Sequence, residues 1–144
     1  MATTGTALET RRLTPADAPD LAALAARLGS SETSVQWVRF LSRPDAVGIA
    51  AVVDGAIVGY AAGEVRGGFG LPAPAAWIEA FGIDLSWRGH GVGRTLLGDL
   101  LGSFRTAGAA HVYTVVPVHD RSLVPFFRQA GLRDEPLACL GCDL

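Results

Sequence analysis

Three glycines alternate with other residues in the stretch Gly89–Gly93, between an apolar segment and a long amphipathic one. Glycine lets the backbone approach a ligand closely and adopt positive φ. Backbone N–H groups at the start of a following helix then converge on one point, with the positive end of the helix dipole behind them. The pattern predicts a site for a phosphate-like anion. The spacing differs from that of dinucleotide-binding folds, and no P-loop lysine follows, so a merely tight strand-to-helix turn is the alternative.

The histidines and cysteines are weaker candidates for chemistry. His90 lies inside the glycine-rich turn, where it either faces solvent or touches a phosphate, and His119 is a candidate for proton transfer. Cys139 and Cys142 have the spacing of a redox or zinc pair, but one pair cannot complete a tetrahedral zinc site. On a strand, this spacing would also place the two sulfur atoms on opposite faces. We therefore expect no metal.

The composition predicts one globular domain over residues 1–144. Hydrophobic residues make up 49% of the chain and charged residues 18%, which excludes a disordered chain. The net charge of −2 gives no general attraction to nucleic acid or acidic membranes, and no apolar stretch approaches the roughly 18 residues of a membrane span. All 12 basic residues are arginine, which excludes lysine chemistry. The low cysteine content and the absence of a signal-peptide pattern predict a cytoplasmic protein.

Hydrophobic periodicity and turn residues predict a mixed α/β domain in the order β-α-α-β-β-β-α-β-α-β. The expected strands are apolar or alternating segments: Leu8–Leu13, Val47–Val53, Ile57–Val65, Ala76–Leu85, His111–Val116, and one or two within Leu132–Leu144. The expected helices carry apolar residues at helical spacing: Leu21–Leu28 after a start at Thr14, Val35–Leu41, Val92–Phe104 and Ser122–Gln129. Asp54-Gly55 predicts a hairpin turn, and Gly67–Pro74 a loop. This order places the glycine-rich turn between a buried strand and the longest helix.

Two stretches resemble motifs of the GNAT superfamily of N-acetyltransferases. Arg88-Gly89-His90-Gly91-Val92-Gly93 resembles the Arg/Gln-x-x-Gly-x-Gly/Ala signature of that family. A later stretch resembles the motif Asn-x-x-Ala-x-x-Leu-Tyr-x-x-x-Gly-Phe. The residues at its fixed places are Asp120, Leu123, Phe126, Phe127, Gly131 and Leu132. The expected element order fits the family from about Leu8 to the end of the chain.

The resemblance implies a splayed mixed sheet that holds acetyl-CoA, the co-substrate, between the fourth and fifth strands. The pyrophosphate would lie on backbone N–H groups of the turn: Gly89, His90, Gly91, Val92, Gly93 and Arg94. The backbone of Ile83 and Leu85 would pair with the pantetheine arm. Arg88 and Arg94 would add positive charge near the phosphates.

The resemblance also implies a general base on the fourth strand. Many members carry a carboxylate near the position of Glu79, four residues before Ile83, and it accepts the proton of the attacking amine, often through water. We expect Glu79 to have this role. A solvated or ion-paired strand glutamate is the alternative.

The proton donor to the leaving sulfur departs from the family pattern. Phe127 stands where the family usually has tyrosine, and phenylalanine carries no proton to give. A thiol has a pKa of about 8.5, so a thiolate can leave unaided near neutral pH. Substitute donors lie nearby in the sequence, none at the motif position: Tyr113, His119, Asp120 and Ser122.

The acceptor is the least determined part of the prediction. Four aromatic residues lie in or near segments that form the acceptor cleft in the family. Core packing is expected for each, with Trp37 and Phe69 stronger candidates for touching substrate than Trp77 and Phe81. The cleft has no obvious cluster of carboxylates, which argues against polyamines. The apolar segment Leu137–Leu144 predicts an exposed edge strand and, through it, a homodimer.

The predicted function is an acetyl-CoA-dependent N-acetyltransferase for a primary amine of a small molecule or a peptide. Two alternatives stay open. Phe127 suggests an acyl-CoA-binding module without turnover, and an accidental resemblance would leave a phosphate-binding protein of another class. Acetyl-CoA binding separates the last alternative from the other two, and release of free thiol with a panel of amines separates enzyme from binding module.

Overall fold

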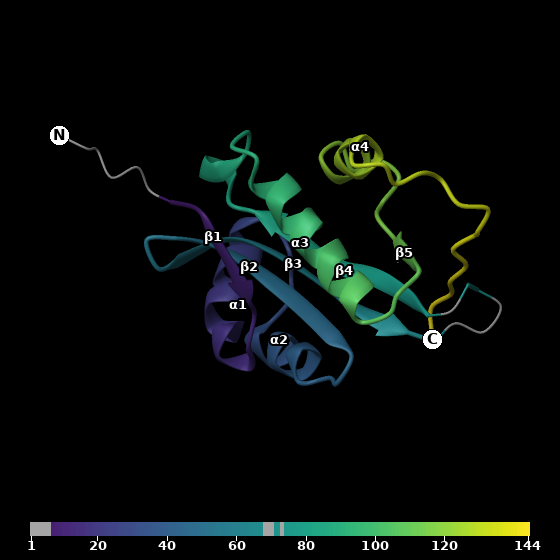
Figure 1. Cartoon of the computed structure of the whole chain (residues 1–144), viewed down its shortest axis with the longest axis horizontal. Helices are drawn as coiled ribbons and strands as arrows, with labels where there is room; N and C mark the ends of the chain where they lie inside the picture. The colour runs from purple at the N-terminus through teal and green to yellow at the C-terminus, as the bar shows by residue number, and fades with distance from the viewer. Residues whose placement is uncertain (1–6, 68–70, 73) are drawn as a thin grey trace.

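The computed structural model describes residues 7–67, 71–72 and 74–144. Its centre is a five-stranded sheet in the spatial order β1-β2-β3-β4-β5, with helices on both faces (Figure 1). Adjacent strands are antiparallel except β4 and β5, which are parallel. The strands are β1 (Glu9–Arg12), β2 (Ala46–Val53), β3 (Ala56–Arg66), β4 (Ala75–Ile83) and β5 (His111–Thr114). The α-helices are α1 (Ala18–Arg27), α2 (Ser34–Leu41), α3 (Val92–Thr106) and α4 (Leu123–Gln129); η1 (Pro15–Asp17) and η2 (Leu85–Trp87) are single 3-10 turns. The expected mixed sheet flanked by helices is confirmed.

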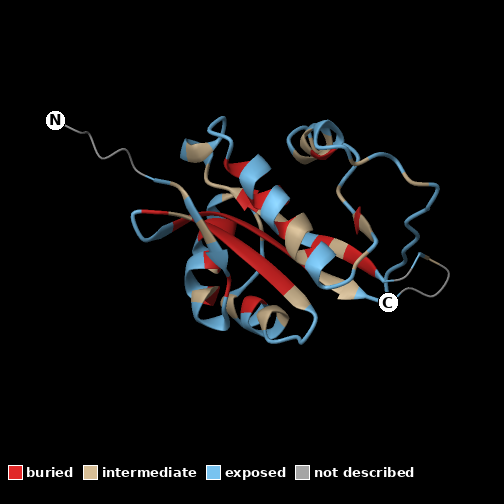
Figure 2. Cartoon of the chain, in the orientation of Figure 1, coloured by how far each residue is buried: buried red, intermediate tan, exposed pale blue. Residues whose placement is uncertain are grey.

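Two clusters of buried side chains lie on opposite faces of this sheet. Ile49 of β2 packs in the cluster that α3 and α4 cover, and its neighbour Ala50 packs in the cluster that α1 and α2 cover. Successive side chains of a strand point to opposite faces, so a central strand between two helical layers must be apolar throughout. Figure 2 shows this for β2 and β3, which are buried along most of their length.

Short-range signals in the sequence explain several of the turns. Asp54 and Gly55 join β2 to β3 with φ of 51° and 78°, which confirms the expected hairpin. Helix α2 begins with a capping box: the Thr33 hydroxyl accepts from the Gln36 N–H at 3.2 Å, and the Gln36 side chain accepts from the Thr33 N–H at 2.7 Å.

The expected strand within Leu132–Leu144 is wrong. The chain from Ala130 to Leu144 contains no helix or strand, and the side chains of Leu140 and Leu144 are exposed. A strand needs a backbone partner along its length, and β5 is only four residues long. Pro136 also removes a donor from the tail. The tail instead meets β5 through side chains, with Glu135 Oε1 at 3.1 Å from His111 Nε2.

Gly63 on β3 has no room for a side chain. A Cβ there would clash with the Trp77 carbonyl oxygen on β4 and lie 2.6 Å from Phe104 Cζ. We expect Gly63→Ala to lower the free energy of unfolding by about 3 kcal/mol, because β3 or β4 must move. Gly98 on α3 is the matched control: nothing lies within 4 Å of a Cβ there, and Gly98→Ala should raise that free energy by about 0.5–1 kcal/mol. Urea unfolding of both variants measures the difference, and effects of the same sign would contradict the assigned packing.

Candidate active site

Strand β4 loses its β5 neighbour halfway along its length. The two strands pair only from Ala75 to Ile78, whereas β4 stays paired with β3 as far as Ile83. At the last paired position the Thr114 hydroxyl donates to the Ile78 carbonyl oxygen at 3.1 Å. Beyond Ile78, β4 therefore has one edge without a strand partner among the described residues.

A β-bulge lies where this free edge begins. Ala62 of β3 pairs with Ala80 and Gly63 pairs with Ile78, so Glu79 has no partner on β3. Farther on, the Asp84 N–H donates to the Val58 carbonyl at 2.8 Å.

Hydrogen bonding alternates along an antiparallel pair of strands, so the bond made by Asp84 decides which residues face the free edge. The N–H and C=O groups of Phe81 and Ile83 point away from β3, and they can pair with an extended ligand. Ile83 was expected to have this role. Phe81 was missed, because its role depends on the register with β3.

The glycine-rich turn follows directly and forms the start of α3. Gly89 and Gly91 both have φ of 80°, and nothing lies within 4 Å of where their Cβ atoms would be. The first bond of α3 runs from the Thr95 N–H to the Gly91 carbonyl at 3.1 Å, so the N–H groups of Val92, Gly93 and Arg94 have no intrahelical acceptor. The turn thus combines open space with free donors at a helix start, which suits a phosphate.

The other predicted residues of the turn differ in their surroundings. Arg88 and Arg94 are exposed and form no ion pair within the described part of the chain. His90 is also exposed, with Nδ1 3.0 Å from the Arg88 carbonyl oxygen. Gly93 has a packing role, since a Cβ there would lie 2.8 Å from Ile83 Cδ1. Leu85 belongs to η2, after the end of β4.

The entry to the turn is held by Asp84. Its carboxylate accepts from the Ser86 hydroxyl at 2.8 Å and from the Ser86 N–H at 3.1 Å. These hydrogen bonds, with a smaller contribution from Arg27, hold the pKa of Asp84 below its usual value of 3.8. Asp84 is therefore a charged cap of η2, which fixes the angle between β4 and the turn.

Glu79 lies on the bulge and is paired with Arg66. The Arg66 guanidinium donates to Glu79 Oε1 and also lies over the Trp77 ring, 5.6 Å from its centroid. The exposed fraction of the side chain is 47% for Arg66 and 30% for Glu79. The structure thus places Glu79 beside the free edge and shows it in an ion pair, which was the alternative to its role as a general base.

Helix α4 contributes an aromatic side chain but no proton donor at the motif position. Phe127 is 3% exposed, with its ring centroid 5.5 Å from that of Phe81 on β4. Asp120 is used to start α4: its carboxylate accepts from the N–H groups of Ser122 and Leu123 at 2.9 and 2.7 Å. Among the substitute donors, His119 and Ser122 are exposed and Tyr113 packs against Trp77.

Of the aromatic residues considered for acceptor contact, the structure buries Trp37 and leaves Trp77 partly exposed. Trp37 is 3% exposed and packs edge-on against Tyr60 at 5.2 Å, so it is a core residue. Burial raises the pKa of Tyr60 to about 12, with a smaller contribution from Glu32. Trp77 is only half-buried and lies next to Glu79. Phe81 packs in the core, and Phe69 lies outside the described residues.

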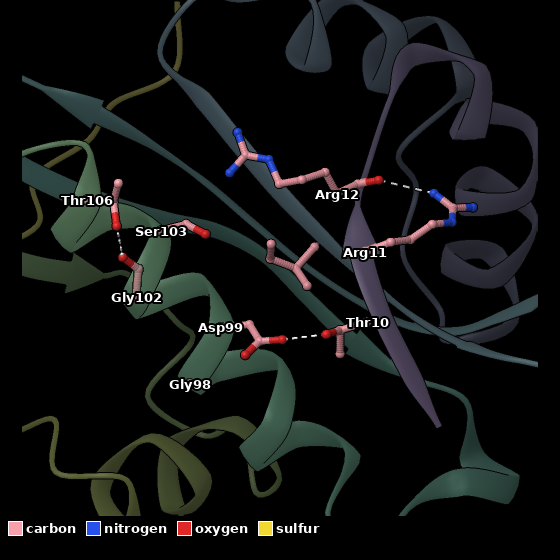
Figure 3. A pocket seen from close by; sticks show the side chains of 9 residues that line it. Thr10, Arg11, Arg12, Gly98, Asp99, Gly102, Ser103 and Thr106 are labelled. Atoms are coloured by element: carbon pink, nitrogen blue, oxygen red, sulfur yellow. Dashed lines mark hydrogen bonds between the residues drawn. The ribbon is translucent and has the colours of Figure 1, made fainter. Parts of the chain in front are cut away.

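Two hollows of the described structure lie elsewhere. One, of about 530 Å³, lies between β1 and α3 and is crossed by a hydrogen bond from the Thr10 hydroxyl to Asp99 Oδ2 at 2.5 Å (Figure 3). The other, of about 600 Å³, lies between η1, the start of α1 and α2. Neither is lined by a residue of the free edge or the turn.

The described segments contain no group of three or more histidine, cysteine or acidic side chains that could hold a metal ion. Cys139 and Cys142 are free and exposed. No helix described in the structure is both long and apolar enough to span a membrane.

A strand with a free edge that leads into an open helix start with free N–H donors is suited to an extended ligand with a phosphate end. The fold and this site define the class of acyl-CoA-dependent transferases. The chain belongs to the acetyltransferase (GNAT) family, whose sequence model matches residues 15–132. This confirms the resemblance and the expected enzyme class, an acetyl-CoA-dependent N-acetyltransferase.

Solved structures agree with this assignment. An acetyltransferase from Trypanosoma brucei is 26% identical over 96% of this chain and 100% of its own, with a TM-score of 0.76. A ribosomal-protein-alanine N-acetyltransferase from Brucella melitensis shares 17% identity over 96% and 100% of the two chains, with a TM-score of 0.80. An aminoglycoside N-acetyltransferase in complex with CoA shares 13% identity over 99% of each chain, with a TM-score of 0.86. The last two show the common fold. No curated protein matches the chain in sequence.

Proposed function

We propose that this protein transfers the acetyl group of acetyl-CoA to a primary amine of a small molecule or a peptide, by direct attack. The observation that carries the proposal is the free edge of β4, which continues into the open turn at Gly89 and Gly91. Similar folds have been solved with CoA and with a bisubstrate analogue that joins CoA to monomethyl-acetylneamine. The CoA-type ligands of these similar folds support acetyl-CoA as the co-substrate of this protein.

The described residues fit acetyl-CoA in two places. Phe81 and Ile83 offer backbone groups to an amide-containing arm, and the N–H groups at the start of α3 offer donors to the pyrophosphate. Arg88 and Arg94 are exposed beside this helix start and add positive charge. Acetyl-CoA, when bound, supplies an activated acetyl thioester.

Glu79 is proposed to take the proton that the acceptor must lose. An alkylamine has a pKa of about 10, so it arrives mainly as an ammonium ion near neutral pH. The Glu79 carboxylate, or a water that it holds, accepts one N–H proton. The neutral nitrogen then attacks the thioester carbon, the C–N bond forms, and the C–S bond breaks with its electron pair leaving on sulfur. The nitrogen loses its second proton to solvent as the amide forms.

The leaving sulfur is proposed to depart without an acid from α4. Phe127 is buried and has no proton to donate. A missing general acid costs about 10²- to 10⁴-fold in rate, and less here because a thiolate is a stable leaving group. The same residue is the observation that favours the second candidate, an acyl-CoA-binding module without turnover.

Free-thiol release with a panel of amines and peptides tests the proposal. We expect acetyl-CoA turnover that rises with pH, less steeply than the neutral fraction of the amine because Glu79 also takes a proton from the ammonium form. Phe127→Tyr should change turnover by less than about 3-fold, because the added hydroxyl enters a packed aromatic cluster. Tight binding of acetyl-CoA without thiol release from any acceptor would establish the binding module instead.

Partners and location are also proposals. Structural neighbours named for aminoglycosides and for ribosomal-protein alanine support both acceptor classes, a small-molecule amine and a peptide. We propose a cytoplasmic protein, supported by its two free and exposed thiols.

Self-association stays a prediction. The exposed side chains of Leu137, Leu140 and Leu144 would be covered in a homodimer, although not through the expected edge strand.

A further inference from the structure

The Arg66 side chain lies along the open face of β4. Arg66 is opposite Ala75 in the β3–β4 register, yet its guanidinium reaches over Trp77 to Glu79, four residues farther along β4. Helices α1 and α2 pack on β2 and β3 (Figure 1). Among the described residues, this part of the face is therefore left to side chains of the strands. Arg66 is exposed, so it can leave without opening the core.

The Trp77 ring beneath Arg66 packs against aromatic residues of β5. The Trp77 ring lies 5.0 Å from that of Tyr113, its register partner, and Tyr113 lies 4.8 Å from His111. His111 in turn is 3.1 Å from the Glu135 carboxylate. The face therefore offers the half-buried Trp77 ring, packed against the buried Tyr113 and next to the Glu79 carboxylate, which attracts cations rather than anions.

The two contacts of Arg66 are the two that an ammonium ion would make at the same place. Its charge pairs with the Glu79 carboxylate, and it lies over the π-face of Trp77. Both partners adjoin the bulge where the free edge of β4 begins. An acceptor that delivers its nitrogen to Glu79 must therefore compete with Arg66.

We infer that Arg66 occupies the acceptor's cation subsite in the free protein and is displaced by the ammonium group of the substrate. The subsite consists of the Trp77 ring face and the Glu79 carboxylate, and it selects cationic amines that carry an apolar or ring-shaped body. Arg66 sets the acceptor affinity by competition. This inference rests on the proposed function, because it assigns the acceptor end of the same site.

Arg43 provides a matched control within the same chain. It makes the same two kinds of contact, an ion pair with Glu64 at 2.8 Å and a position over the Phe40 ring at 5.5 Å. Glu64 lies in the paired part of the sheet, opposite Trp77 in the register, and not on the bulge. Removing Arg43 therefore breaks equivalent contacts and leaves Arg66 in place over Trp77 and on Glu79.

The test measures binding and catalysis separately. Benzyltrimethylammonium is a cation that cannot be acetylated, and calorimetry gives its affinity for the wild type, Arg66→Ala and Arg43→Ala. We expect Arg66→Ala to bind it about 5-fold more tightly and Arg43→Ala to bind it unchanged, since an exposed ion pair and one cation–π contact are removed as competitors. Adding Glu79→Gln to Arg66→Ala should abolish the gain. With benzylamine as acceptor, Arg66→Ala should lower KM about 5-fold at unchanged kcat.

Each opposite result identifies a different error. Equal or weaker binding of the cation by Arg66→Ala would overturn the inference and make Arg66 a support for Glu79. If Arg66→Ala instead loses binding of benzoate, an anionic probe, while Arg43→Ala keeps it, the inference would also be overturned, because Arg66 would then bind an anion. If no amine gives thiol release in the wild type but Arg66→Ala still binds the cation more tightly, the proposed function fails and the cation subsite stands.

Discussion

Gly91→Val is expected to weaken acetyl-CoA binding by at least about 100-fold, or about 3 kcal/mol. Gly91 has φ of 80° at the start of α3, with open space where a side chain would be. A β-branched residue is strongly disfavoured at this φ. It must either distort the turn or project into the space through which phosphates reach the helix N–H groups. Calorimetric titration with acetyl-CoA measures the loss.

Gly108→Val separates backbone strain from loss of contact. Gly108 has φ of 93°, also with nothing within 4 Å of its Cβ, but it lies beyond the other end of α3. It should suffer a similar loss of stability and keep wild-type affinity. Gly93 is unsuitable for this purpose, because a side chain there would meet Ile83 and Phe126. A folded Gly91→Val variant with unchanged affinity would move the phosphate site away from this turn.

Glu79→Gln is expected to lower kcat by about 100-fold at pH 7. The amide keeps the shape of the side chain but cannot take a proton. With an amine pKa of about 10, only the small neutral fraction of the acceptor then reacts. The deficit should therefore be largest at low pH and shrink as the pH rises toward the pKa of the amine. Affinity for acetyl-CoA should stay within about 2-fold, because the phosphate-binding turn is unchanged.

Glu64→Gln is the control for the lost ion pair. Glu64 lies on the neighbouring strand β3, and this substitution removes its ion pair with Arg43 while the bulge stays intact. Its pH–rate profile should match the wild type, which attributes the effect of Glu79→Gln to proton transfer and acceptor binding. A wild-type pH–rate profile for Glu79→Gln would remove Glu79 from the mechanism.

The parts of the site that the sequence predicts are local in the chain. The turn at Gly89–Gly93 is visible because positive φ favours glycine and because the helix that follows repeats its apolar residues every turn. The Asp54-Gly55 hairpin is predictable for the same reason. Phe127 could be compared with a motif position because α4 and its flanking residues form one continuous stretch. In each case the responsible interactions lie within a few residues.

Tertiary structure decided what depends on pairing between distant segments. The bulge at Glu79 exists only in the register of β4 against β3, and the free edge only because β5 stops pairing at Thr114. The same register directs Arg66 over Trp77 onto Glu79, so an isolated glutamate in the sequence becomes half of an ion pair.

The C-terminal tail and Trp37 show the same limit. Leu137–Leu144 is apolar enough for a strand, but a strand requires a partner, and the short β5 does not pair with it. Trp37 is a residue type that often contacts substrates, but its ring packs against Tyr60 and is buried. Composition and periodicity therefore determined the class of fold and the open glycine-rich turn before α3 of this protein. Which side chains lie beside the free edge of β4 was decided by strand register and helix packing, because these depend on contacts between residues far apart in the chain.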